Sequence, residues 1–119
     1  MRRLERLLPR VILVALCFSA QGTRAFASDE ESIERVLAAG RQAVLERHFG
    51  QAIRVLRSGL KDHPEDTHLR LELGRAYLSA GEDGPALRLF REILRTQPEQ
   101  RDAKLELARA LGFRGEYKA

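Results

Sequence analysis

The 119-residue chain has 21 basic and 17 acidic residues and a formal net charge of +4, but this charge is unevenly distributed. Residues 1–27 hold five arginines and one glutamate, which leaves 16 basic and 16 acidic residues in the rest of the chain. Because that remainder is neutral, the composition argues against a nucleic-acid partner. The single cysteine, Cys17, excludes a disulfide within the chain.

Residues 1–27 have the layout of a secretory signal peptide. An Arg-rich start precedes an apolar run over residues 11–20, which is short for a membrane-spanning helix. Ala25-Phe26-Ala27 then supplies a small-x-small cleavage site. We expect cleavage after Ala27 and a periplasmic or secreted product. An uncleaved anchor or a buried helix would account for fewer of these features.

Cys17 raises the alternative of a lipoprotein, because lipid-attachment cysteines follow a short apolar run. Here Leu16 precedes the cysteine where a small residue is preferred, and apolar sequence continues beyond it. We therefore expect Cys17 to be removed with the leader.

Five amphipathic helices are predicted in the rest of the chain. Ser28 and Glu31 have capping-box spacing at the start of the first. Pro85 falls in the first turn of the fourth, where its missing N–H is tolerated. Residues 81–84, rich in Gly and acidic residues, turn the chain before it. The expected helices cover residues 30–47, 51–61, 67–80, about 85–96 and 101–114.

Each helix has an apolar stripe that we expect to be buried. Gly59 interrupts the stripe of the second helix, which indicates close packing at that point, since glycine weakens a helix. Pro64 ends this helix, and Asp66 is a suitable N-cap for the next. The stripes of the first, second and fifth helices are Ile33, Val36, Leu37 and Val44; Ile53, Leu56 and Leu60; and Leu105, Leu107, Ala108 and Leu111.

The chain repeats itself when it is shifted by 34 residues. Small residues then align with small ones, large with large, and proline with proline, which chance would not usually give in one register. The aligned sets are Leu37, Leu71 and Leu105; Gly40, Gly74 and Ala108; Ala43, Tyr77 and Leu111; Ala52 and Ala86; Leu56 and Phe90; Leu60 and Leu94; Pro64 and Pro98.

The middle unit, residues 67–100, resembles a tetratricopeptide (TPR) repeat. It has Leu73-Gly74 and Tyr77 on its first helix, Ala86 and Phe90 on its second, and a closing Pro98; the matching positions elsewhere include Gly40, Ala52, Pro64, Leu107 and Ala108. The resemblance implies an all-α solenoid of antiparallel helix pairs. It divides residues 28–119 into repeats at about 33–66, 67–100 and an incomplete 101–119.

The resemblance also implies a scaffold that binds a protein or peptide, with no cofactor. Some TPR proteins bind chaperone tails through a clamp of Lys and Asn residues. The corresponding places here hold Leu37, Arg41 and Glu72, which argues against that activity. Because the last repeat is incomplete, we expect a longer protein, another partner or a second copy of the chain to cover its open end.

Arg41, Arg75 and Arg109 recur at the repeat period on the first helix of each unit. One interpretation is a column that binds a carboxylate or acidic peptide, with His68 and Asp102 lining the same groove. The other is local pairing, because Glu72 and Glu106 lie three residues before Arg75 and Arg109, although Arg41 has Ala38 at that place.

No catalytic or metal-binding arrangement stands out. His63 and His68 flank two acidic residues, but their spacing matches no zinc motif, and the segment is needed as connector and cap. No Ser/His/Asp set or phosphate loop is present, so we expect no enzyme within these residues.

The sequence thus predicts an exported TPR adaptor. Two alternatives remain: the periplasmic front part of an outer-membrane export or assembly protein that continues as a β-barrel, or the regulatory arm of an enzyme.

Overall fold

The structure is a computed structural model that describes residues 29–113. The leader, with Cys17 and the expected cleavage site after Ala27, lies outside the described residues. The chain divides into two units, residues 1–32 and 33–119, and the packing described below concerns the second. None of the helices over residues 29–113 is long and apolar enough to span a bilayer.

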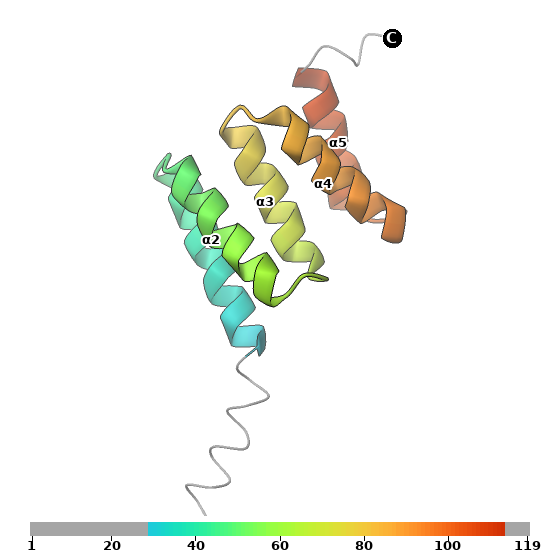
Figure 1. The fold of residues 1–119 in the computed structure, drawn as a ribbon. Helices are drawn as coiled ribbons and strands as arrows, with labels where there is room; N and C mark the ends of the chain where they lie inside the picture. Colours follow the sequence, from blue (N-terminus) through green and yellow to red (C-terminus); the bar gives the residue numbers. More distant parts are fainter. Residues whose placement is uncertain (1–28, 114–119) are drawn as a thin grey trace, which may run out of the picture. The chain divides into compact units, whose positions relative to one another are not determined.

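All regular structure in residues 29–113 is helical, which confirms the all-α helical-repeat class (Figure 1). The first helix ends at residue 45, two residues earlier than expected. Gly84 and Pro85 lie within the first turn of the fourth helix, which begins at Asp83. The helices cover residues 29–45, Phe49–Asp62 (α2), Thr67–Ser79 (α3), Asp83–Thr96 (α4) and Arg101–Phe113 (α5).

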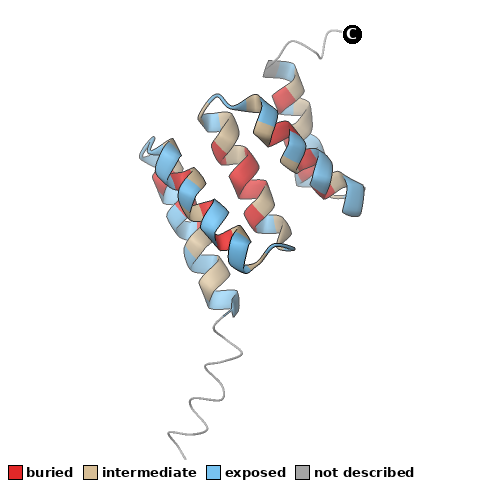
Figure 2. Cartoon of the chain, viewed as in Figure 1, coloured by how far each residue is buried: buried red, intermediate tan, exposed pale blue. Residues whose placement is uncertain are grey.

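The central helix, α3, packs against both α2 and α4, and α5 packs against α4 and α3. Two clusters of buried side chains result, and α3 contributes to both, with Leu69 and Leu73 in the first and Leu71 in the second. Half-buried Tyr77 contacts both clusters. Buried residues therefore follow α3 along much of its length (Figure 2).

Small residues set the distance between the helices of a pair. The ring of Phe90, which is fully buried, fills the space where Gly74 would carry a Cβ. In the preceding pair, a Cβ on Gly40 would lie 2.7 Å from Cγ of Leu56, so the same contact recurs one repeat earlier. Gly59 likewise packs against Val36, at the close approach that the sequence suggested.

The two proline connectors have the same structure. The backbone N–H of Asp66 donates to the carbonyl of His63 across Pro64, and Gln100 donates to Gln97 in the same way across Pro98. The carboxylate of Asp66 also accepts from the N–H of Leu69 at 2.8 Å and caps α3. The same backbone hydrogen bond thus recurs at equivalent positions of the two repeats.

One expected core residue of α5 is exposed. Leu105 belongs to the apolar stripe that is expected to be buried, but it is 54% exposed, whereas its equivalents Leu37 and Leu71 are 3% exposed. Those two are packed among residues of the helices that follow them. The described part of the chain has no further helix after α5, so the buried face of α5 consists of Ala103, Glu106 and Ala110, with Leu107 and Leu111 packed at its side.

Candidate functional site

The structure brings the three repeat-spaced arginines into one groove of about 760 Å³. Arg41 projects from the first helix, Arg75 from α3 and Arg109 from α5, so the groove crosses the first helix of each unit. Its other lining residues are Val44, Leu45, Glu72, Leu78, Ser79 and Glu106.

The arginines alternate with two glutamates in a ladder of ion pairs. Oε1 of Glu72 accepts from Arg41 Nη2 at 3.1 Å and from Arg75 Nη1 at 2.9 Å. Oε1 of Glu106 accepts from Arg75 Nε at 2.9 Å and lies 3.7 Å from Arg109 Nη1. Each glutamate thus joins the arginine of its own helix to that of the preceding repeat. We call these five residues the arginine ladder.

The acidic side chains of the ladder are much more buried than the arginines at its two ends. The side chains of Glu72 and Glu106 are 11% and 6% exposed, whereas those of Arg41 and Arg109 are 53% and 61% exposed. Buried carboxylates need partners because desolvation disfavours their charge. The glutamates are therefore held inside, and the arginines at the two ends face the groove.

Arg75, at the centre of the ladder, donates hydrogen bonds to both glutamates. Burial disfavours its charge, but the hydrogen bond to Glu106 and the charges of Glu72 and Glu106 outweigh burial, so the pKa of Arg75 is raised. With three guanidinium groups against two carboxylates, the ladder keeps one positive charge. That excess is available at Arg41 and Arg109 rather than at Arg75.

The pairings within one helix, Glu72 with Arg75 and Glu106 with Arg109, were anticipated from their spacing. The spacing within a helix does not predict the pairings between repeats, which join Arg41 to Glu72 and Arg75 to Glu106. Arg41 has no acidic residue three positions before it, and the structure supplies Glu72, 31 residues ahead, in its place. Arg75 and Glu106 repeat that separation of 31 residues, and this recurrence is the signal that the sequence offered.

The groove also has an apolar side that the sequence did not reveal. Leu45, at the end of the first helix, is 77% exposed and lines the groove beside Val44 and Leu78. A large exposed apolar side chain next to exposed guanidinium groups suits a ligand with both apolar and acidic groups.

The remaining candidate residues lie outside this groove. His68 and Asp102 are both exposed, and neither is among the lining residues. Over residues 29–113, no three His, Cys, Asp or Glu side chains come together in a way that could hold a metal ion.

Comparison with known protein families gives one match. Residues 67–110, which include α3, α4 and most of α5, match the family model described as Tetratricopeptide repeat. This segment is less than half of the chain. Repeats of this kind indicate a protein-interaction scaffold and are typically non-catalytic. The comparison with curated proteins finds no match to this chain.

Proposed function

We propose that the chain is an exported scaffold without catalytic activity that binds a protein or peptide in the groove of the arginine ladder. The observation that carries this proposal is that the exposed Leu45 lines the same groove as the exposed Arg41 and Arg109. A bound segment would place an apolar side chain against Leu45, Val44 and Leu78. A carboxylate of the same segment would pair with an end arginine of the ladder.

The ladder also supports this proposal through pre-organisation. Arg41 is held by Glu72 before any partner arrives, which reduces the entropy that binding must remove. The carboxylate of a partner would meet a guanidinium already fixed in position.

Capture of partners from a cell-envelope extract tests the groove with a matched pair of leucines. Leu45→Ala and Leu105→Ala each shorten an exposed leucine, but only Leu45 lines the groove. We expect the Leu45→Ala variant to lose partners that wild type and Leu105→Ala retain, and Arg41→Gln/Arg109→Gln to lose the same ones. An unchanged partner list for Leu45→Ala and for the arginine variant would contradict the proposal.

Export is tested separately, by expressing the full chain in a bacterium and determining the N-terminus of the product by mass spectrometry. The three-part leader predicts a product that begins at Ser28 and is recovered from the periplasm or medium. An intact Met1 terminus in the cytoplasm would contradict export and leave the groove proposal standing.

A second candidate is the periplasmic front part of an outer-membrane export or assembly protein. The exposed Leu105 favours it, because its equivalents are covered by the helices that follow them. Sequencing beyond residue 119 tests this candidate: alternating apolar strands would support it, and a stop codon would contradict it.

A further inference from the structure

The second helices of the two repeats, α2 and α4, carry a basic pattern that the groove does not use. Three cationic residues on α2 recur 34 positions later on α4. All six side chains are exposed. The pairs are Arg54 with Arg88, Arg57 with Arg91, and Lys61 with Arg95. We call these six residues the outer basic face.

These six cations differ from the arginine ladder in having no acidic partner. Within the described residues, none of them makes an ion pair or a side-chain hydrogen bond. The two helices hold only three acidic residues, Asp62, Asp83 and Glu92, so the positive charge of the outer basic face is incompletely balanced. A surface of this kind attracts acidic partners and steers their approach.

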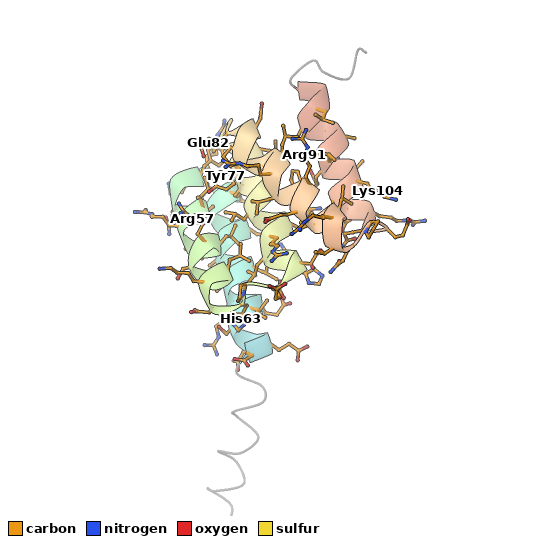
Figure 3. All side chains as sticks on the ribbon, turned by 45° about the vertical axis from the view of Figure 1, so that its right-hand side comes forward. Arg57, His63, Tyr77, Glu82, Arg91 and Lys104 are labelled. Atoms are coloured by element: carbon orange, nitrogen blue, oxygen red, sulfur yellow. The ribbon has the colours of Figure 1, made fainter. Side chains whose placement is uncertain are left out.

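A second hollow lies beside the α4 half of this face. Its volume is about 550 Å³, and the side chains of Arg88, Arg91 and Arg95 line it together with Glu92. The apolar part of its lining consists of Leu73 and Tyr77 from α3 and Pro85 and Leu89 from α4. In Figure 3, Arg57 and Arg91 are seen on either side of Tyr77.

We propose that the outer basic face binds an acidic protein segment, separately from the groove. One large apolar side chain of that segment would enter the hollow against Leu73 and Leu89, and flanking carboxylates would pair with the arginines of α4. Arg88 and Arg95 are separated by about 10 Å along the helix, from a rise of about 1.5 Å per residue. An extended segment covers this distance with about three residues at about 3.3 Å each.

The charge and the apolar hollow together favour a protein segment over the other anionic partners. A membrane surface would be anchored by large exposed apolar side chains, yet in residues 29–112 those are Leu45 and Leu105, and neither is on α2 or α4. A nucleic acid would require an overall positive domain and aromatic stacking surfaces. Residues 28–119 are neutral, and Tyr77 is half-buried.

The test uses the full chain and a fluorescein-labelled peptide of four glutamates with a central phenylalanine, followed by fluorescence anisotropy at low salt. We expect binding that weakens as salt is added, because exposed charge pairs are screened. Arg88→Gln/Arg91→Gln/Arg95→Gln should weaken it about tenfold or more. Replacing the phenylalanine by alanine, or Leu89 by alanine, should also weaken it.

The chain offers two matched controls. Arg54→Gln/Arg57→Gln/Lys61→Gln removes the equivalent cations of α2, whose side chains do not line the hollow, so we expect a smaller loss. Arg41→Gln/Arg109→Gln alters only the groove and removes the contribution of peptide bound there. The binding that remains in this variant should still be lost when Arg88→Gln/Arg91→Gln/Arg95→Gln is added. Circular dichroism checks that each variant keeps its helices.

Three results would overturn the proposal. The peptide does not bind the wild-type chain at low salt, or the α4 triple variant binds it as well as wild type, or the α4 substitutions remove no further binding from the groove variant. Vesicles of anionic phospholipid and a single-stranded oligonucleotide are run in parallel. If either binds through the α4 arginines while the peptide does not, the partner class is wrong.

Discussion

The first helices and the second helices of this chain both carry arginines at the repeat period, yet the two sets of arginines are in opposite electrostatic situations. Arg41, Arg75 and Arg109 alternate with the buried Glu72 and Glu106. The exposed cations of α2 and α4 have no such partner among the described residues. A repeating arginine therefore does not by itself indicate a free binding charge. The arginine is neutralised where the next repeat places a glutamate against it, as Glu72 and Glu106 do.

The two sets do share one requirement, the close packing of α3 and α4, and breaking it should have the largest effect. Gly74→Val forces side-chain atoms into the space of the buried Phe90 ring and should cost about 3 kcal/mol of unfolding free energy. Urea denaturation measures the loss. The matched control is Gly50→Ala on α2, where a Cβ would meet nothing within 4 Å. It should instead stabilise the protein by up to about 1 kcal/mol.

An Arg→Gln substitution in the arginine ladder can be compared directly with one on the outer basic face. Arg75→Gln leaves Glu72 and Glu106 without a shared partner and should lower the unfolding free energy by about 1–2 kcal/mol. Arg91→Gln removes an exposed, unpaired cation and should change the unfolding free energy by less than about 0.5 kcal/mol. Equal losses of unfolding free energy at the two positions would show that Arg75 is no more firmly paired than Arg91.

A smaller effect is expected at the turn within the first repeat. Arg47 has a φ of 63°, and its equivalent in the next repeat, Gly81, has a φ of 79°. Because this conformation disfavours a side chain, Arg47→Gly should stabilise the protein by about 1 kcal/mol. A thermal melt checks this. A lower melting temperature for Arg47→Gly would show that the Arg47 side chain makes a compensating contact.

The pH dependence of the ladder should be the smallest effect near neutrality. The pKa of Arg75 is raised in the folded state, so its contribution to stability is fully present below its ordinary pKa. That contribution is lost only as the pH rises through the raised value. The difference in unfolding free energy between wild type and Arg75→Gln should therefore stay constant from pH 7 to about pH 10. A steady decline over that range would contradict the assignment.

The sequence predicted the fold because its main determinants are local. Gly74 and Phe90, or Pro64 and Asp66, belong to one helix pair or one connector, and their spacing is set by helix and turn geometry. Contacts between repeats depend instead on how each pair is rotated against the next. The partner of Arg41 and the exposure of Leu45 and Leu105 are of this second kind, so the pattern within a helix could not predict them.

The most direct test of the ladder is a double-mutant cycle between Arg41 and Glu72, which are 31 residues apart in the sequence. The unfolding free energies of wild type, Arg41→Ala, Glu72→Ala and the double variant give their coupling. The ladder predicts a coupling of about 0.5–1 kcal/mol, since Arg41 is partly exposed to solvent. Additive effects would contradict a pairing between repeats.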